Sequence, residues 1–285
     1  MRNTAQIQAV IFDWAGTVID HGSLAPVTVF LDVFYKHNLK LKLDQVRQFM
    51  GLAKKDHIRS LLELPEVRKQ RPELNQPGEI PRFTEELYTD FLEFQVESIL
   101  EHCQMIDGIP QMVEALKARN IRIGSTTGYP REIINMVIPK AAEQGFEPEV
   151  TYTGTEVASG RPAPWMIYQV AEGLGIYPMD LLIKVDDTLA GIEAGVYAGC
   201  WTIGVSRTGN LIGLSKKEFE SLSPEEQNRR LKRAEVSLKE AGADYVVESA
   251  ADILPLIETI NRRLEAGERR FTNNSHEIHE AVTEV

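Results

Sequence analysis

Short apolar runs alternate with helix-like patterns over most of the chain. The run Ala9–Phe12 is apolar and contains β-branched residues, which is typical of a buried strand. Similar strand-like runs recur at residues 121–124, 181–185, 201–205 and 245–247. Apolar positions at helical spacing fill the segments between them, at residues 111–118, 131–144, 165–173 and 189–198. This alternation predicts an α/β fold: a doubly wound, Rossmann-like core with a parallel sheet and its site at the carboxyl ends of the strands.

The alternation stops after the first strand and resumes only near residue 104. Helical patterns dominate this stretch, at residues 27–36, 54–62 and 83–100. Pro72, Pro77 and Pro81 fall in a polar segment that is expected to break the helices. The stretch is therefore predicted to be an α-helical cap domain inserted into the sheet domain.

The predicted boundaries divide the chain into three parts. The core domain comprises residues 1–20 and 104–266, and the inserted cap comprises residues 21–103. Within the core, residues 209–241 form a charged helical excursion before the last strand. Residues 267–285 are polar and have few apolar side chains, so we expect a loosely ordered C-terminal tail.

Composition and charge narrow the class of protein. With 285 residues, 43% hydrophobic and 26% charged, the chain can bury a sizeable core. Its formal net charge of -11 would repel nucleic acid and acidic membranes, so we expect neither as a partner. An anionic substrate would need a local cluster of donors. The two cysteines lie far apart and no signal peptide precedes the first strand, which predicts a reduced, cytoplasmic enzyme.

Acidic side chains follow two of the predicted strands. Asp13 ends the first strand, and Asp186 and Asp187 follow the strand at residues 181–185. A lone aspartate at a strand end is more often a helix cap or a turn former than a functional group. Two such clusters are less easily explained as turns, because together they supply the hard oxygen ligands that Mg2+ requires. A carboxylate in this position can also act as a nucleophile.

Two further segments offer groups that bind phosphate. Thr127 supplies a hydroxyl after the second strand, and the Gly128 amide can approach a phosphate closely. Arg161 precedes a predicted helix start, with Pro162 expected in the first turn, and its guanidinium can hold phosphate in bidentate fashion. Alone, the first segment reads as an ordinary polar turn and the second as a surface arginine.

In this order and at these spacings, the four elements together resemble the motifs of the haloacid dehalogenase superfamily. The resemblance spans the sheet domain and implies a hydrolase with Asp13 as nucleophile. It implies phosphate-binding roles for Thr127, Gly128 and Arg161, with the arginine replacing the usual lysine. The implied Mg2+ ligands are Asp13, the Ala15 carbonyl and Asp187. Asp186 is expected to support the site without touching the ion, although the sequence leaves open which of the adjacent aspartates binds it.

The residue two positions after Asp13 is unusual for a phosphatase of this superfamily. That position normally carries an aspartate that protonates the leaving group, and here it is Ala15. In the cap, residues 50–57 read Met-Gly-Leu-Ala-Lys-Lys-Asp-His and resemble the lysine-bearing motif of the phosphonoacetaldehyde hydrolase family, whose spacing selects Lys54 over Lys55. Adjacent lysines on a helix are more often a solvated face, but the missing acid favours a catalytic lysine.

This second resemblance implies a small phosphonate substrate, phosphonoacetaldehyde, cleaved to acetaldehyde and phosphate in 2-aminoethylphosphonate degradation. Lys54 would form an imine that accepts the electrons of the breaking carbon-phosphorus bond, and Asp13 would become an aspartyl phosphate. His57 shares a helix face with Lys54 and would relay protons. Met50 and Tyr129 match positions near the family's site, where they would exclude water, although either could equally fill the core.

Two residues depart from the pattern of the family. Ser23 stands where some relatives carry a cysteine, and Gly191 stands where some carry a second acid after the magnesium strand. The adjacent pair of Asp186 and Asp187 is another variant found in the superfamily. Neither departure removes a group on which the covalent chemistry depends.

Other functions remain open on the sequence alone. A phosphomonoester phosphatase or sugar-phosphate mutase on this scaffold would require an acid at Ala15. A non-catalytic binding protein with this fold would not need all of Asp13, Thr127, Arg161, Asp187 and Lys54. The family also implies a homodimer, through cap helices such as residues 27–36, and a cap that closes about joints near His21 and Cys103.

Overall fold

The structure is a computed structural model in which residues 6–270 are described. Its centre is a parallel sheet of six strands in the order β3-β2-β1-β4-β5-β6. The strands are β1 (Ala9–Phe12), β2 (Arg122–Thr127), β3 (Val150–Thr153), β4 (Leu182–Asp186), β5 (Trp201–Val205) and β6 (Tyr245–Val247). All residues of β1, β4 and β5 are buried, as expected for strands covered on both faces. The predicted fold class is confirmed.

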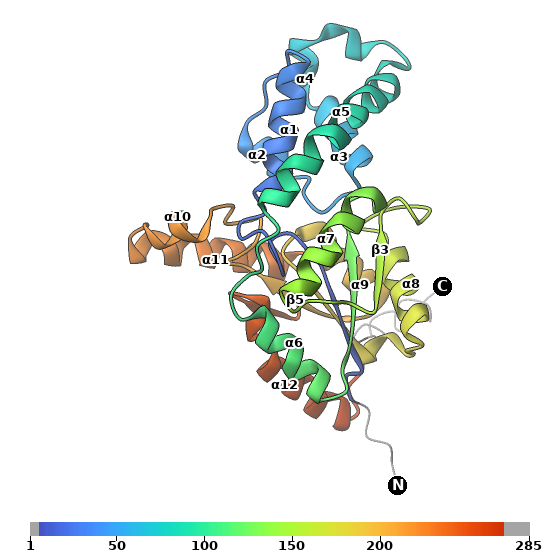
Figure 1. The fold of residues 1–285 in the computed structure, drawn as a ribbon, viewed down its shortest axis with the longest axis vertical. Coiled ribbons are helices and arrows are strands. Elements are labelled where there is room, and N and C mark those ends of the chain that lie inside the picture. The colour runs from blue at the N-terminus through green and yellow to red at the C-terminus, as the bar shows by residue number, and fades with distance from the viewer. Residues whose placement is uncertain (1–5, 271–285) are drawn as a thin grey trace, which may run out of the picture.

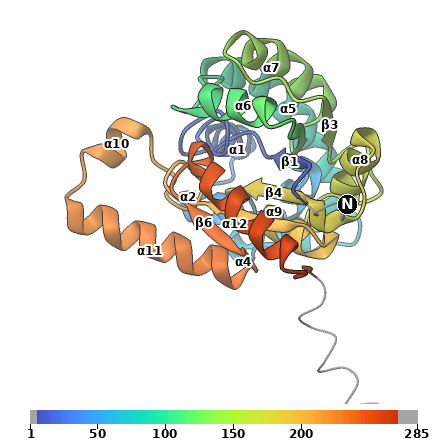
Figure 2. The ribbon, with the colours of Figure 1, turned by 90° about the horizontal axis from the view of Figure 1, so that it is seen from below.

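Helices cover both faces of the sheet (Figures 1 and 2). The crossover from β1 to β2 contains α6 (Ile109–Ala118), and that from β2 to β3 contains α7 (Arg131–Glu143). The crossover from β3 to β4 contains α8 (Trp165–Leu174), that from β4 to β5 contains α9 (Leu189–Ala198), and that from β5 to β6 contains α11 (Pro224–Glu240). From β1 the chain adds β2 and β3 on one side of the sheet and then β4, β5 and β6 on the other. Right-handed crossovers that run in opposite directions place their helices on opposite faces, so the direction of winding reverses between β1 and β4. Such a switch point is where α/β sheets bind ligands.

Five helices lie together above the carboxyl ends of the strands (Figure 1). They are α1 (Ala25–Lys36), α2 (Leu43–Arg47), α3 (Lys54–Glu63), α4 (Pro65–Gln70) and α5 (Glu79–Glu101). Their core, which includes Phe30, Phe83 and Phe91, is a hydrophobic cluster separate from the one that surrounds the sheet. These separate cores support the proposed division into a cap and a core domain.

The first cap helix begins where the chain leaves the sheet domain. Asp20 is buried, and its two carboxylate oxygens accept the backbone N–H groups of Leu24 and Ala25, each at 3.0 Å. Pro26 follows in the first turn, where a missing N–H is not needed. A carboxylate at a helix start satisfies donors that have no partner within the helix, so Asp20 fixes the direction of α1.

Four proline positions behave differently from one another. Pro72 opens the short 3-10 helix η1 (Pro72–Asn75), and Pro77 lies in the connection that follows. Pro81 does not break a helix, because α5 already begins at Glu79 and its first turn tolerates proline. Pro162 is not in a first helical turn as predicted, since α8 begins only at Trp165.

The last part of the described chain closes the sheet domain. It contains η2 (Met179–Leu181), α10 (Lys216–Glu220), η3 (Ala250–Asp252) and α12 (Leu254–Glu265). Helices α10 and α11 form the predicted excursion, and they extend to one side in Figure 1. Arg269 and Arg270 pair with Asp180 and Asp244 at 3.2 and 2.9 Å. The rest of the predicted tail, residues 271–285, lies outside the described residues.

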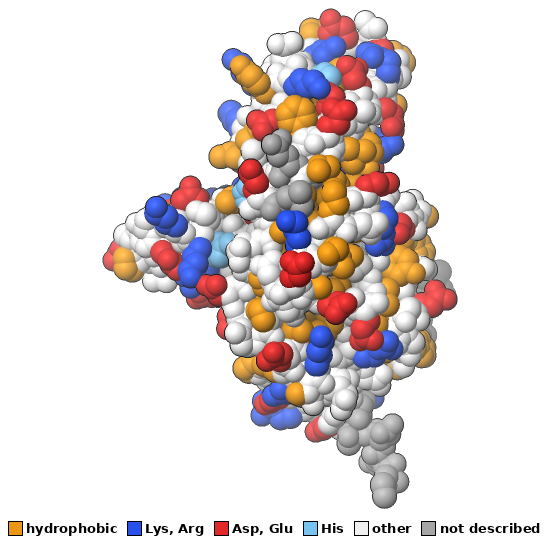
Figure 3. Space-filling view, viewed as in Figure 1, with side chains coloured by type: hydrophobic (Ala, Val, Ile, Leu, Met, Phe, Trp, Pro, Cys, Tyr) orange, Lys and Arg blue, Asp and Glu red, His pale blue; other side chains and the backbone are white. Residues whose placement is uncertain are grey.

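The surface charge and the length of the helices bear on the expected partners. Acidic and basic side chains are intermingled over the face seen in Figure 3, with no large basic tract on that face. In residues 6–270, every helix is too short or too polar to span a bilayer. Cys103 and Cys200 are both free and buried.

Candidate active site

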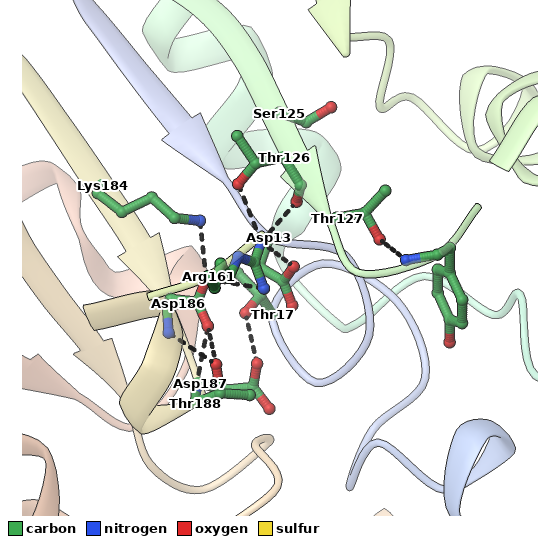
Figure 4. A network of polar contacts seen from close by, with 12 residues as sticks. Asp13, Thr17, Ser125, Thr126, Thr127, Arg161, Lys184, Asp186, Asp187 and Thr188 are labelled. Carbon is green, nitrogen blue, oxygen red and sulfur yellow. Dashed lines mark hydrogen bonds and ion pairs between the residues drawn. The ribbon is translucent and has the colours of Figure 1, made fainter. Parts of the chain in front are cut away.

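Three carboxylates meet at the switch point between β1 and β4. Asp13 directly follows β1, Asp186 ends β4, and Asp187 is the next residue. The Asp13 backbone N–H donates to the Val185 carbonyl at 3.0 Å, which continues the ladder of the two strands up to the site. One oxygen from each of the three carboxylates lies within 4.8 Å of the others, and all three residues are buried. Figure 4 shows the three side chains at the ends of their strands.

Arg161 enters this cluster from the loop before α8. Its Nη2 donates to Asp13 Oδ1 at 2.7 Å, and to the Thr126 carbonyl and hydroxyl at 2.8 and 2.9 Å. Its Nη1 lies 3.4 Å from Asp186 Oδ2. Burial lowers the pKa of the guanidinium, but the charges of Asp13 and Asp186 outweigh that effect and raise it. Arg161 is therefore a fixed cation that aligns the proposed nucleophile, not a surface arginine.

Asp186 is held by groups that sequence reasoning did not identify. Lys184 Nζ lies 2.8 Å from its Oδ2, and both side chains are fully buried. The Thr188 backbone N–H and hydroxyl donate to its Oδ1 at 3.0 and 2.7 Å. Burial raises the pKa of Asp186, but the neighbouring cations Arg161 and Lys184 lower it overall. Asp186 is thus an ionised carboxylate in a fixed position.

This arrangement gives a physical reason for glycine at position 191. A Cβ added to Gly191 would lie 2.0 Å from Asp186 Cγ, so the carboxylate occupies the space of a side chain there. Gly191 also donates its N–H to the Thr188 hydroxyl at 3.1 Å, which caps α9. An acid at 191 and Asp186 in its present position exclude each other, and Asp186 brings a carboxylate to the same place.

Asp187 completes the acidic cluster. Its Oδ1 accepts the Thr17 hydroxyl at 3.2 Å, and its Oδ2 accepts the Asn210 backbone N–H at 2.7 Å. Burial and the charges of Asp13 and Asp186 raise its pKa well above the ordinary value. Burial also raises the pKa of Asp13, although Arg161 opposes it. A divalent cation would relieve this repulsion among buried carboxylates, and their oxygens are the ligands that such ions prefer.

A small, partly open cavity lies beside the cluster. It is lined by residues of the sheet domain and of the helical layer: Asp13, Ala15, Ser23, Pro26, Met50, Gly51, Lys54, Thr127, Gly128, Tyr129, Arg161 and Thr188. The cavity thus brings together the predicted nucleophile, the predicted phosphate ligands and the predicted lysine. His57, Asp186 and Asp187 are not part of its lining.

Lys54 is the first residue of α3 and points into aromatic surroundings. Its Nζ lies 5.0 Å from the centre of the Tyr129 ring, and 5.4 and 5.8 Å from those of Phe30 and Phe91. It has no ion-pair partner in the described part of the chain, and only 6% of the residue is exposed. Burial lowers its pKa to about 8, although Asp13 opposes the shift. At pH 7 roughly one such amine in ten is neutral and able to act as a nucleophile.

The neighbouring lysine points elsewhere. Lys55 Nζ contacts the two carboxylate oxygens of Glu85 at 2.8 and 2.6 Å and lies over the ring of Tyr88. Its side chain is 41% exposed and does not line the cavity. Of the two lysines, only Lys54 is brought to the acidic cluster.

His57 is buried one turn along α3 from Lys54. Its Nε2 lies 2.9 Å from the Val46 carbonyl, which can only accept, so this nitrogen carries the proton. The ring is 3.9 Å from that of Phe30. Burial and the nearby Lys54 lower the His57 pKa well below its ordinary value, so the ring is neutral. The structure does not bring His57 into the cavity, and its predicted proton relay remains untested.

A loop of the cap reaches the sheet domain at positions where two glycines are required. Gly51 has a φ of +92°, and an added Cβ would lie 2.3 Å from the Thr188 hydroxyl. A Cβ on Gly128 would lie 2.7 Å from the Leu52 carbonyl. The cap is therefore seated against the sheet domain, and Met50 and Tyr129, both buried, lie beside Lys54 in the same cavity.

Some functional contacts had weak or no sequence signals. Lys184 had a weak sequence signal, because a lysine inside an apolar strand that ends in two acids needs a buried partner. Thr188, after Asp187, had the sequence of a helix cap. The contacts of Thr17, Thr126 and Asn210 depend on loop positions that no local pattern specifies.

Comparison with known proteins agrees with the class that this fold and site define. The family model described as haloacid dehalogenase-like hydrolase matches residues 7–199. That range contains Asp13, Lys54, Arg161 and the acidic pair that ends β4. The chain is therefore a hydrolase of the haloacid dehalogenase-like family, and the predicted superfamily is confirmed.

More specific relatives were found among curated proteins and solved structures. The chain is 40% identical to phosphonoacetaldehyde hydrolase of Paraburkholderia phytofirmans, over 92% of this chain and 98% of that protein. It is 36% identical to the enzyme of the same name from Bacillus anthracis, over 90% and 98%. The crystal structure of a phosphonoacetaldehyde hydrolase-like protein from Oleispira antarctica superposes with a TM-score of 0.89 at 37% identity, over 93% and 96%. Within its class, the chain belongs to the phosphonoacetaldehyde hydrolase family.

Proposed function

We propose that this enzyme hydrolyses the carbon-phosphorus bond of phosphonoacetaldehyde, giving acetaldehyde and phosphate. The observation that carries the proposal is the cavity lined by Lys54, Asp13 and Ala15. It holds a buried amine of lowered pKa opposite a strand-end carboxylate, and an alanine where a phosphatase needs an acid. The names of the relatives support the same substrate.

The first step is condensation of the Lys54 amine with the substrate aldehyde. Loss of water gives a protonated imine between Lys54 Nζ and the aldehyde carbon. The aromatic walls provided by Phe30 and Tyr129 exclude water and suit a cation of low charge density. The aromatic faces around Lys54 Nζ can partly offset the cost of burying the iminium charge.

The second step is phosphoryl transfer to Asp13. Its carboxylate attacks phosphorus, the carbon-phosphorus bond breaks, and the bonding electrons form the carbon-carbon double bond of a neutral enamine on Lys54. The imine nitrogen takes up the electron pair that neutralises its charge, so the leaving group needs no acid at Ala15. Arg161, at 2.7 Å from Asp13 Oδ1, orients the attacking carboxylate and offers its charge to the phosphoryl oxygens.

Hydrolysis of both covalent links completes the reaction. Water attacks the aspartyl phosphate, releases phosphate and restores the Asp13 carboxylate. Protonation of the enamine carbon regenerates an imine, which water cleaves to acetaldehyde and free Lys54. The Thr127 hydroxyl and the Gly128 amide line the cavity and are proposed to hold the phosphoryl oxygens.

We propose Mg2+ as the resident metal ion. The donor set fits, because the carboxylates of Asp13, Asp186 and Asp187 outnumber the cations of Arg161 and Lys184 in a buried cluster. Asp13 and Asp187, with the Ala15 carbonyl, would hold the ion, and Asp186 would support them. When bound, Mg2+ supplies positive charge that draws a phosphonate dianion to the site and offsets the charge that develops during transfer.

A trapping experiment tests the proposed reaction. The protein is incubated with phosphonoacetaldehyde and Mg2+, reduced with borohydride, and mapped by peptide mass spectrometry while phosphate release is measured. We expect a reduced two-carbon adduct on Lys54 in a phosphate-releasing enzyme. Reduction without substrate is the control for background labelling. Absence of both the adduct and phosphate would reject the proposal.

The pH dependence of the reaction should reflect Lys54. Because only the neutral amine attacks the aldehyde, and burial sets its pKa at about 8, kcat/KM should fall about tenfold per pH unit below that value. Bound Mg2+ is a further cation near the amine and would lower the apparent pKa, so the limb should lie at or below 8. The measurement is a pH profile at saturating Mg2+. A Lys55→Met variant should keep the limb in place, and a profile without an acidic limb would contradict this assignment.

Several predictions made from the sequence remain proposals. These are a homodimer formed through cap helices such as α1, a cytoplasmic location and a role in 2-aminoethylphosphonate degradation. Closure of the cap about joints near His21 and Cys103 is also a proposal. The close packing of Gly51 against Thr188 at the edge of the cavity supports it, because this contact would separate when the cap moves away from the sheet domain.

A further inference from the structure

Arg47, at the end of the short helix α2, connects the cap to the sheet domain. Its Nη1 donates to the Gly22 carbonyl at 3.1 Å and to Asn210 Oδ1 at 2.9 Å, and its Nη2 donates to the Gly213 carbonyl at 3.0 Å. Asn210 returns a bond, since its Nδ2 donates to the Arg47 carbonyl at 3.1 Å. Arg47 and Asn210 therefore each donate a hydrogen bond to the other, which links the cap to the loop that follows β5.

The same loop reaches the acidic cluster. The backbone N–H of Asn210 donates to Asp187 Oδ2 at 2.7 Å, so the residue that receives Arg47 also fixes the proposed metal ligand. The loop is shaped for this contact at Gly213, whose φ is +65° and whose added Cβ would lie 2.5 Å from Arg47 Cζ. Arg47 is not part of the lining of the reaction cavity, and among the described residues it makes no hydrogen bond or ion pair with those to which the chemistry is assigned. Its charge does interact with that of Asp187, which opposes the lowering of the Arg47 pKa by burial.

We propose that Arg47 is a positioning residue that couples seating of the cap to the placement of Asp187. When the cap is seated, Arg47 holds Asn210, and Asn210 holds the carboxylate that would bind Mg2+. When the cap opens, the arginine leaves, and the loop can move the N–H away from Asp187. This inference rests on the proposed function, because it assigns a metal-binding role to Asp187 and an opening motion to the cap.

Coupling of this kind acts in both directions. If a seated cap improves the geometry for Mg2+, then bound Mg2+ must favour the seated cap by the same factor. The consequence is measurable without turnover. In the wild-type protein, Mg2+ should slow amide hydrogen exchange in residues 43–52, which comprise α2 and the loop that contacts Thr188.

The test uses Arg47→Met, which keeps the length of the side chain but removes its donors. The matched control is Arg82→Met in α5, whose described partners, Glu79 and Glu86, both lie in the cap. We expect Arg47→Met to raise the dissociation constant for Mg2+ by about fivefold to tenfold and to abolish the Mg2+-dependent protection. Arg82→Met should keep both at wild-type values.

A second variant separates the interaction from general damage. Asn210→Ala removes both side-chain bonds to Arg47 but keeps the N–H that Asp187 accepts. It should weaken the protection only in part, because Arg47 keeps its bonds to the Gly22, Gly213 and Asn210 backbone carbonyls, and adding Arg47→Met should remove the remainder. The inference is overturned if Mg2+ protects the cap equally in wild type and Arg47→Met, or does not protect it in wild type. Failure of the proposed function has a different signature, namely a wild-type protein without a Lys54 adduct or phosphate release.

Discussion

Replacing Lys54 by methionine is expected to abolish phosphate release from phosphonoacetaldehyde and at the same time to stabilise the folded chain. Without the amine no imine forms, and the carbon-phosphorus bond has no electron acceptor, so we expect a loss of about 10^4-fold or more in kcat/KM. The residue is buried among Phe30, Phe91 and Tyr129, where a methionine of similar length packs without charge.

The expected gain in stability follows from the lowered pKa. A shift from 10.5 to about 8 means that the charged amine disfavours folding by up to about 3 kcal/mol. For a base with a lowered pKa, this cost is fully present below the folded-state value of about 8 and disappears as the pH rises through 10.5. Lys54→Met should therefore raise the free energy of unfolding by about 1 to 3 kcal/mol at pH 7, and by little near pH 11. Urea unfolding at the two pH values measures the difference.

Lys55→Met is the matched control for this experiment. It removes an exposed pair with Glu85, which contributes at most about 1 kcal/mol, and it leaves the cavity unchanged. We expect near wild-type turnover and no pH-dependent gain in stability. A Lys54→Met protein that still cleaves the substrate would show that Lys54 does not have the proposed role. One that is less stable than wild type at neutral pH would contradict the lowered pKa of the buried amine.

The sheet could be predicted because its strands are buried on both faces. Continuous apolar runs such as Ala9–Phe12 have no alternative in a soluble domain, and each predicted run became a strand. β3 (Val150–Thr153) was missed, since it is an edge strand of only four residues with mostly half-exposed side chains. Helices α2 and α4 were missed for a similar reason, because five or six residues give too little periodicity to detect.

The acidic cluster could be predicted because strand ends converge at a switch point. Asp13 and Asp187 were predicted as strand-end acids and Arg161 as a phosphate-binding group, and the structure places the two acids together and Arg161 against Asp13. The role of Lys184 could not be assigned, since only the packed structure directs its amine to Asp186. The choice of Lys54 over Lys55 came from the spacing of the family motif, since both begin the same helix and one helical turn alone does not decide which side chain faces inward.

Two site predictions illustrate how packing modifies helix-face arguments. Lys54 and His57 are three residues apart on α3, as predicted, yet only Lys54 lines the cavity. The carbonyl of Val46, from a helix the sequence did not indicate, accepts a hydrogen bond from His57 Nε2–H and keeps the ring among aromatic side chains. Two residues on the same face of one helix therefore do not always line the same cavity or share a path for protons.

Replacing Asp13 by asparagine is expected to separate the two covalent steps. An amide of the same shape cannot attack phosphorus, so phosphate release should fall by about 10^4-fold or more. The imine step should survive, because Asp13 raises the pKa of Lys54 and its neutralisation leaves the amine less protonated. Arg161 keeps Asp186 as an ionic partner at 3.4 Å, so the buried guanidinium is not left without a counter-charge. Borohydride should therefore still trap substrate on Lys54 in a protein that releases almost no phosphate.

The double variant Asp13→Asn with Lys54→Met provides the control, and it should show neither adduct nor phosphate. If Asp13→Asn alone lost the adduct as well, imine formation would depend on the carboxylate, and the two steps would not be separable as proposed. If it retained phosphate release, another group would have to be the nucleophile. The expected combination, trapped substrate without phosphate, requires an amine that acts before the carboxylate, which is the order that a cavity with Lys54 opposite Asp13 permits.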